Sequence, residues 1–327
     1  MENKRLYTPS RVKELLNAHG FSFTKALGQN FLIDGNVVRS IVQGAGLTKE
    51  DRVLEIGPGI GTLTEELALT GKSVLAVELD EKLRPILQES LRPYDNVDII
   101  YGDALKLDLK EEWEKRYGKD PVHVVANLPY YVTTPILGAL FDLDLPLESL
   151  TVMVQKEVAK RMAASPGTKD YGALSLFIAF HSEASLVAKV PNTVFIPRPK
   201  VDSAVVHMKV KESPLNISKE KFSLIVKAAF SKRRKTLLNA FSSYGFPLDK
   251  NDVREILRKS GIEETRRAET LSLEDFLVLT INFPDDLTWK DGHGLYIFKC
   301  RRRGQNTGKI CSLWGGSLPY WPSQFYF

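Results

Sequence analysis

Cysteine is nearly absent from this 327-residue chain, which has only Cys300 and Cys311, both near the C-terminus. Residues 1–284 contain none, so a disulfide framework or a cysteine-based zinc cluster is excluded for the body of the protein, and no metal site is expected. No run of eighteen apolar residues exists either, so we expect no transmembrane helix and no membrane partner. The first residues, MENKRLYTPSRVKELL, lack the apolar segment of a secretory signal, and a cytoplasmic location is expected.

Acidic residues are missing from one long stretch of the chain. Residues 221–248 contain six Lys or Arg and no Asp or Glu, although the net charge of the whole chain is only +5. Four consecutive cations, Lys232, Arg233, Arg234 and Lys235, interrupt an apolar pattern of helical spacing there. An ordinary solvated helix face mixes charges of both signs. The run therefore favours contact with RNA phosphates over a merely solvated face.

Strands and helices alternate through the first two thirds of the chain. The expected strands are residues 52–57, 73–80, 96–105, 121–130, the first part of 150–162, and 203–210. Helical patterns occupy residues 62–71 and 81–91, the second with Pro85 as a candidate kink. This alternation is typical of an α/β fold with a doubly wound, mostly parallel sheet. Ligands of such sheets bind beyond the carboxyl ends of the strands.

The pattern becomes purely helical after about residue 211. Helical periodicity is found in residues 218–244, 249–260 and 272–281, and the texture changes again beyond residue 284. We expect three parts, an α/β domain, a small all-helical RNA-binding domain and an atypical tail, over residues 1–210, 211–284 and 285–327. The tail is interpreted as a lineage-specific extension or as out-of-frame translation. We expect it to be poorly packed and unnecessary for catalysis.

The motif EIGPGIG (55–61) places three glycines between a strand and a helix. Glycine is needed where the backbone takes positive φ or a ligand approaches closely. The spacing is GxGxG rather than the GxGxxG of dinucleotide sites, and Glu55 suits a positively charged amino-acid ligand. Glu78 and Asp103, at the ends of the next two strands, can accept from ribose hydroxyls and from an adenine amine. Together these features describe S-adenosylmethionine.

The segment VVANLPYYVTTPIL (124–137) sets an amide and two aromatic rings where a strand ends. The Asn127 side-chain oxygen and the Leu128 carbonyl are two acceptors for the two N–H groups of an adenine amine. Tyr130 can stack on the ring of a base that has been flipped out of its helix. Positioning and electrostatics then suffice for methyl transfer, and no strong general base is needed.

Six motifs in order resemble the KsgA/RsmA family of ribosomal RNA adenine dimethyltransferases, which is related to the Dim and Erm enzymes. The motifs are GQNFLID (28–34), VLEIGPGIGTLT (53–64), VELD (77–80), GDAL (102–105), NLPYYVTTPIL (127–137) and FIPRPKVDSAVV (195–206). The resemblance covers about residues 5–283. It implies a Rossmann-like class I methyltransferase domain, and a monomer that acts on rRNA within the small ribosomal subunit or its precursor. The implied reaction adds two methyls to N6 of each of two adjacent adenosines near the 3′ end of small-subunit rRNA.

Carried over by position, the resemblance implies a site that holds S-adenosylmethionine without binding it tightly. Its residues are Gln29, Asn30, Leu32, Glu55, Gly57, Gly59, Glu78, Asp103, Ala104 and Asn127. The first three close over the methionine end, the glycine loop contacts the methionine moiety, and the acids at the strand ends bind ribose and adenine.

The implied target pocket consists of Asn127, Leu128, Pro129, Tyr130 and Phe195. Asn127 binds the reacting amine, and Phe195 supplies a further aromatic surface for the flipped base. By composition alone, Phe195 is more typical of a core residue.

Three other functions are alternatives to this one. An Erm-like enzyme that methylates large-subunit rRNA would use the same chemistry, so the catalytic residues do not separate the two. A non-catalytic assembly factor of the same fold is disfavoured because the expected cofactor and target residues are all present. An NAD-dependent oxidoreductase is disfavoured by the glycine spacing.

Overall fold

The computed structural model describes residues 5–212, 217–285, 288–291 and 294–297. Internal contacts divide the chain into two compact units. Of the described residues, the first unit contains 5–159 and 183–210, and the second contains all the others. The second of these segments ends at Val210, where the sequence predicts the end of the α/β domain. Residues 160–182, which the sequence predicts to lie in the α/β domain, belong to the second unit.

The first unit is built on a seven-stranded sheet of order β4-β3-β2-β5-β6-β9-β7. Its strands are β2 (Arg52–Ile56), β3 (Ser73–Glu78), β4 (Val97–Tyr101), β5 (Val122–Asn127), β6 (Leu147–Gln155), β7 (Ser182–Val190) and β9 (Ser203–Val210). Strands β4, β3, β2, β5 and β6 pair in parallel, and β9 pairs antiparallel with β6. The doubly wound, mostly parallel sheet is therefore confirmed.

The central strands were recognisable because helices cover both faces of the sheet, so that nearly every residue is apolar and buried. Four of the five residues of β2 and five of the six residues of β3 are buried. Strand β7 was not expected from the sequence. Only its first and last residues are buried, so it lacks the apolar run by which the other strands were found.

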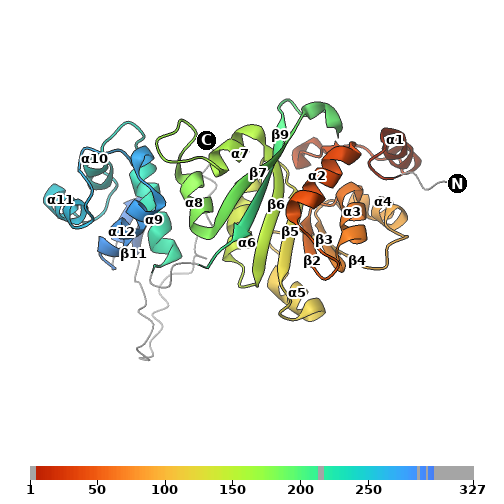
Figure 1. Ribbon diagram of the computed structural model, residues 1–327, viewed down its shortest axis with the longest axis horizontal. Coiled ribbons are helices and arrows are strands. Elements are labelled where there is room, and N and C mark those ends of the chain that lie inside the picture. The colour runs from red at the N-terminus through yellow and green to blue at the C-terminus, as the bar shows by residue number, and fades with distance from the viewer. Residues whose placement is uncertain (1–4, 213–216, 286–287, 292–293, 298–327) are drawn as a thin grey trace. The chain divides into compact units, whose positions relative to one another are not determined.

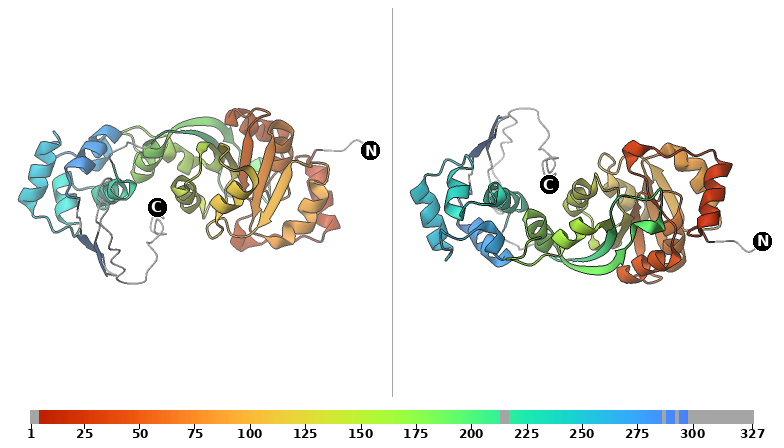
Figure 2. Two further views of the ribbon diagram at one scale, coloured as in Figure 1. Left: turned by 90° about the horizontal axis from the view of Figure 1, so that it is seen from below. Right: turned by 90° about the horizontal axis from the view of Figure 1, so that it is seen from above.

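Helices flank the strands of this unit (Figures 1 and 2). They are α1 (Pro9–Ala18), α2 (Gly35–Ala45), α3 (Thr62–Thr70), α4 (Arg84–Ser90), α5 (Leu109–Tyr117) and α6 (Thr133–Asp142). Helix α7 (Lys156–Met162) follows β6 and continues past residue 159, where this segment of the first unit ends. Helices α2 and α3 cover one face, where Ile41 and Leu67 join Val74 and Val205 of the strands in a single buried cluster. The candidate kink at Pro85 is wrong. Residues 81–83 form a 3-10 turn, and Pro85 lies in the first turn of α4, where a missing N–H costs little.

Two very short strands pair antiparallel outside the main sheet. They are β1 (Phe31–Leu32) and β8 (Phe195–Ile196), with Leu32 opposite Phe195. The backbone N–H of Ile33 continues the pairing by donating to the carbonyl of Val194 (2.9 Å). This pairing fixes the N-terminal segment of the unit against the segment that leads into β9.

The second unit is mainly helical in its described residues. Its helices are α8 (Ala173–His181), α9 (Lys219–Phe230), α10 (Leu237–Ser242), α11 (Lys250–Lys259) and α12 (Leu273–Asn282), with the hairpin β10 (Thr288–Asp291) and β11 (Gly294–Ile297). The helices expected over 249–260 and 272–281 are confirmed. The continuous helical periodicity expected over 218–244 is not. Residues 231–236 form a turn between α9 and α10, and Leu237 donates its backbone N–H to the carbonyl of Arg266 (2.8 Å).

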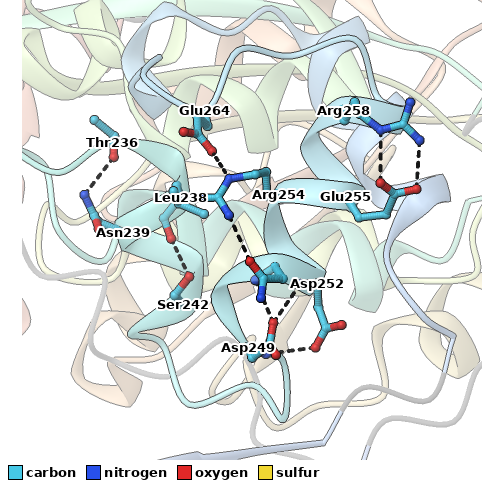
Figure 3. Close-up of polar contacts among 11 residues, drawn as sticks. Thr236, Leu238, Asn239, Ser242, Asp249, Asp252, Arg254, Glu255, Arg258 and Glu264 are labelled. Carbon is cyan, nitrogen blue, oxygen red and sulfur yellow. Dashed lines mark hydrogen bonds and ion pairs between the residues drawn. The ribbon is translucent and has the colours of Figure 1, made fainter.

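Helix α11 shows how this unit uses charge in an ordinary exposed helix (Figure 3). Asp249 caps its first turn by accepting from the backbone N–H groups of Asn251 (2.6 Å) and Asp252 (2.9 Å). Arg254 pairs with Glu264 (2.7 Å), and Arg258 pairs with Glu255 (2.9 Å). The arginines of this helix are therefore neutralised within the protein.

The expected tail is described only in part. Apart from residue 285 and the β10–β11 hairpin, it lies outside the described residues. Within the part of the chain that the structure describes, no helix combines the length and the apolar character needed to span a membrane.

Candidate active site

A cavity of about 240 Å³ lies in the first unit, at the carboxyl ends of the parallel strands. All ten expected cofactor residues line it, and so do Leu128, Pro129 and Tyr130. These residues are far apart in the sequence but meet because parallel strands all end at the same edge of the sheet. Within the described residues, no group of three or more His, Cys, Asp or Glu side chains is placed to hold a metal ion.

The glycine loop presents bare backbone to the cavity. Gly57 follows β2 with φ +75°, and a Cβ added there would meet no atom within 4 Å. Gly59 has φ +62°, and a Cβ there would lie 3.0 Å from the ring of Phe31. The first glycine leaves room for a ligand against the main chain, and the second lets Phe31 close over the loop.

Glu55 is a buried residue in the wall of the cavity and is only 1% exposed. The Oε2 atom of its carboxyl group is buried and has no hydrogen-bond partner among the described residues. Burial raises its pKa to about 8, and the nearby Glu78 carboxylate acts in the same direction. A cationic ligand at this wall would lower the pKa of Glu55 again, because it would stabilise the ionised carboxylate.

Glu78 ends β3 and is 6% exposed. Burial raises its pKa to about 6, while backbone donors oppose that rise. The N–H of Asp80 donates to Oε1 (2.8 Å) and the N–H of Gly59 donates to Oε2 (3.0 Å). Each carboxylate oxygen has a further lone pair, so this fixed group can still accept from a ligand.

Asp103 lies just beyond β4, beside Ala104 in the cavity wall. Its Oδ1 accepts from the backbone N–H of Leu105 (3.0 Å), and Nζ of Lys106 lies 3.6 Å from its Oδ2. The strand ends at Tyr101 rather than at residue 105 as expected, so Asp103 is held by a turn.

Asn127 is the last residue of β5. Its Nδ2 donates to the backbone carbonyl of Asn30 (3.2 Å). This contact orients the amide and leaves its oxygen, Oδ1, as an acceptor for a ligand. Leu128 continues the sheet pairing by donating its N–H to the carbonyl of Met153 (3.2 Å). The strand thus holds the amide rigidly at the edge of the cavity.

The two tyrosines after Pro129 differ in their surroundings. The Tyr130 hydroxyl forms a hydrogen bond with the Ser203 hydroxyl on β9 (2.6 Å). Tyr131 is 41% exposed at the cavity, and its ring lies 3.4 Å from where a Cβ on Gly28 would be. The sequence does not predict Ser203 or Asp80, a buried carboxylate two residues after Glu78, as site residues. Both lie inside the quoted motifs, but only the tertiary structure shows their partners.

Phe195 is the one expected target-pocket residue that does not line the cavity. It is 3% exposed and belongs to the same buried cluster as Leu32, its partner in the β1–β8 pair. The ring packs in the interior in this structure, as composition alone suggested, and is not open to a base. The spacing of the FIPRP motif gave no signal of this burial.

The four cations Lys232, Arg233, Arg234 and Lys235 lie in the second unit, in the exposed turn between α9 and α10. We call residues 232–235 the basic turn. Nε of Arg233 lies 3.9 Å from Oε2 of Glu269, and its Nη2 donates to the carbonyl of Lys169 over 3.4 Å. No described acidic side chain forms an ion pair with the other three cations. The basic turn therefore differs from the paired arginines of helix α11.

The sheet order, the glycine loop after β2 and the cavity at the strand ends define a class I methyltransferase. A dimethyladenosine transferase from Plasmodium falciparum is similar, with 26% identity and a TM-score of 0.67 over 76% of this chain and 95% of that one. The 23S rRNA methyltransferase ErmE has 27% identity and a TM-score of 0.59, over 77% and 99% of the two chains.

A family model described as "Ribosomal RNA adenine dimethylase" matches residues 20–283. This chain therefore belongs to the ribosomal RNA adenine dimethylase family, and it is an enzyme of the methyltransferase class. Two relatives are each named "Ribosomal RNA small subunit methyltransferase A". The protein from Alkaliphilus oremlandii is 48% identical over 86% of this chain and 99% of its own length. That from Bacillus licheniformis is 49% identical over 85% and 97%. The resemblance seen in the sequence is thus confirmed.

Proposed function

We propose that this enzyme transfers methyl groups from S-adenosylmethionine to N6 of two adjacent adenosines near the 3′ end of small-subunit rRNA. The substrate is the rRNA within the small ribosomal subunit or its precursor. The names of the relatives support the small subunit as the target, and the family description supports adenine dimethylation.

The observation that carries the proposal is the orientation of Asn127. Because its Nδ2 is engaged by the Asn30 carbonyl, its oxygen is the group left to accept an N–H from an adenine amine. The carbonyl of the following residue, Leu128, offers the second acceptor. Two acceptors on one amine direct the nitrogen lone pair away from both of them, and rigid placement lowers the barrier without a strong base.

The cavity wall fits S-adenosylmethionine group by group. Glu55, a buried carboxyl with an unpartnered oxygen, suits the cationic methionine end, and the open backbone at Gly57 lets that end approach. Glu78 accepts from the ribose hydroxyls. Asp103 accepts from the adenine amine, beside Ala104. The cofactor supplies an electrophilic methyl group, and the side chains of the cavity wall hold it and the amine in place.

Tyr130 provides the stacking surface for the target base in this proposal. Its hydroxyl is anchored by Ser203, so the ring has little freedom to turn. A fixed ring costs less conformational entropy when a base stacks on it. Pro129 and Leu128 complete the pocket, and Phe195 supports it from the core through its pairing with Leu32.

We further propose that the basic turn binds rRNA phosphates. Its cations are exposed and mostly lack acidic partners, whereas the arginines of α11 are paired. Structured RNA is bound mainly through its shape and backbone. We also propose that the enzyme acts on this substrate as a monomer in the cytoplasm.

The test is methyl transfer from tritiated S-adenosylmethionine to under-methylated small subunits, followed by nucleoside analysis. Dimethyladenosine at two adjacent positions of the small-subunit rRNA is the expected product. Large subunits serve as the comparison, because methylation there would instead assign the Erm-like activity. Absence of product on both, from a chain that binds S-adenosylmethionine, would favour a non-catalytic assembly factor.

A further inference from the structure

Gln29 lines the cavity, yet the protein itself occupies both polar groups of its side chain. Its Oε1 accepts from the backbone N–H of Thr24 (3.0 Å), and its Nε2 donates to Oδ2 of Asp80 (2.7 Å). One N–H and one oxygen lone pair of this primary amide remain after these contacts. The side chain is therefore placed to hold the chain rather than chiefly to bind a ligand.

Asp80 is a fixed anchor for this contact. It is 7% exposed, and its other oxygen, Oδ1, accepts from the backbone N–H of Lys82 (3.1 Å). Its own N–H donates to Oε1 of Glu78 (2.8 Å). Asp80 thus bonds directly to the carboxylate that we assign to the ribose, and Gln29 reaches that carboxylate through Asp80.

The next residue along the chain reaches the other side of the cavity. The side chain of Asn30 donates to the carbonyl of Gly28 (2.8 Å), which stiffens the local turn. Its backbone carbonyl accepts from Nδ2 of Asn127 (3.2 Å). Two consecutive residues therefore join the end of β3 to the end of β5, that is, the cofactor side of the cavity to its catalytic amide.

The geometry points to residues 24–30 as a strap that couples the cofactor site to the orientation of Asn127. In this inference, Gln29 and Asp80 are positioning residues, because they act through Glu78 and Asn30 rather than on the reacting atoms. The inference rests on the proposed function, which supplies the role of Asn127. When Gln29 is hydrogen-bonded to Asp80, the strap holds the Asn30 carbonyl where it orients the Asn127 amide.

The strap predicts two linked effects where a simple cofactor contact would predict one. Loosening the Gln29–Asp80 contact weakens S-adenosylmethionine binding, because the strap borders its site. It also lowers the methyl-transfer rate at saturating cofactor, because Asn127 loses its orientation. A residue that only bound the cofactor would affect the first quantity and not the second.

The test exchanges donor and acceptor across the contact. Gln29→Glu places two carboxylates face to face, and Asp80→Asn places two amides there. The double variant, Gln29→Glu/Asp80→Asn, restores one donor and one acceptor in exchanged positions. Its new carboxylate accepts from both the Thr24 N–H and the new amide, whose oxygen still accepts from the N–H of Lys82. Gln43→Glu, on the exposed surface of α2, is the matched charge control.

Calorimetry with S-adenosylmethionine and single-turnover methylation of small subunits are measured for the parent and all variants. We expect Gln29→Glu to weaken cofactor binding about tenfold or more, and to slow turnover at saturating cofactor. The double variant should recover both to within about threefold of the parent, and Gln43→Glu should change neither. Thermal melts establish that each variant is folded, and Gln29→Ala, which adds no charge, replaces Gln29→Glu if that variant does not fold.

The inference would be overturned if the losses of affinity and rate in the two single variants simply added in the double variant. It would also be overturned if a Gln29 variant kept the parental affinity and rate. A loss of affinity alone, with a parental rate at saturating cofactor, would reduce Gln29 to a local support of the cofactor site and would also overturn the coupling. The calorimetry needs no RNA. If the parent binds S-adenosylmethionine but methylates no small subunit, the proposed substrate fails while the affinity cycle still decides whether the contact exists.

Discussion

The two units of this protein use charged side chains in opposite ways. In the first unit, Glu55 and Glu78 are buried acids whose pKa values are raised by burial, to about 8 and about 6. In the second unit, the basic turn is exposed, and three of its four cations form no ion pair with a described residue. A buried charge discriminates one small ligand by local contacts, whereas exposed charges attract a large polyanion and respond to salt.

This contrast predicts that variants of the two units separate cleanly. Changes at the cavity should alter cofactor affinity or the rate of methyl transfer, and leave the salt dependence of RNA binding alone. Changes at the basic turn should alter the salt dependence of RNA binding and leave cofactor affinity unchanged.

The largest effect is expected for Asn127→Ala. Single-turnover methylation of small subunits should fall by about a hundredfold or more, the scale seen when one preorganised polar group is removed from an active site. Subunit affinity should barely change, because it comes from many phosphate contacts. Asn36→Ala, an exposed asparagine in α2 of the same unit, is the control. A near-parental rate would remove Asn127 from the catalytic role.

Glu78→Ala should weaken S-adenosylmethionine binding by about 1–3 kcal/mol, since the ribose hydroxyls lose a charged acceptor. Calorimetry measures this directly, with Glu89→Ala as a control at an exposed glutamate that pairs with His19. The salt slope of RNA binding should stay parental. Unchanged cofactor affinity in a folded variant would contradict the ribose assignment.

Reversing Arg233 and Arg234 to Glu should weaken subunit binding and flatten its dependence on salt, by about one unit of slope for each phosphate that is no longer bound. The control reverses Arg254 and Arg258, which makes the same change in net charge on residues that are already paired. Free cofactor affinity should be parental in both. Equal salt slopes for the two double variants would return the basic turn to an ordinary solvated surface.

A smaller effect is expected at the hydrogen bond between Tyr130 and Ser203. Tyr130→Phe and Ser203→Ala should each slow turnover by about two- to tenfold, the value of one hydrogen bond. The double variant should be no slower than the worse single variant, because all three lack the same bond. Single-turnover rates decide this, and fully multiplicative losses would show that the two hydroxyls act independently.

The smallest effect concerns the pH dependence of stability without cofactor. The pKa of Glu55 is raised from its ordinary value of 4.5 to about 8. Between those pH values the folded state keeps a proton that the unfolded state has released, so the free energy of unfolding falls as pH rises. Glu55→Gln removes this dependence. Its melting temperature relative to the parent should therefore rise from about pH 5 to about pH 8, and a constant difference would mean that Glu55 is ionised when folded.

Much of the cavity lining could be predicted from the sequence because its residues lie at strand ends. A buried parallel strand reads as an apolar run, and the position where that run stops marks the edge at which ligands bind. Glu78 and Asn127 were found in this way, and both line the cavity. Strand β7 was missed because its mostly unburied residues give no such run.

The helical unit shows where periodicity misleads. Helical spacing predicts one apolar face made of Phe222, Val226, Phe230, Leu237 and Phe241, and all of these are buried except Phe230, which is partly buried. They belong, however, to two helices, α9 and α10, with the basic turn between them. Periodicity reports which side chains are buried and does not reveal a break whose two sides both bury apolar residues.

The sequence by itself determined the class of fold, the family and most residues of the cavity, because these depend on local patterns of apolar, glycine and acidic residues. Only the tertiary structure decided which of these residues bond to one another. Gln29 meets Asp80 and Tyr130 meets Ser203 across 51 and 73 residues of chain, and Phe195 is buried against Leu32. Such contacts depend on how the ends of separate strands converge in space, which no local pattern of residues encodes.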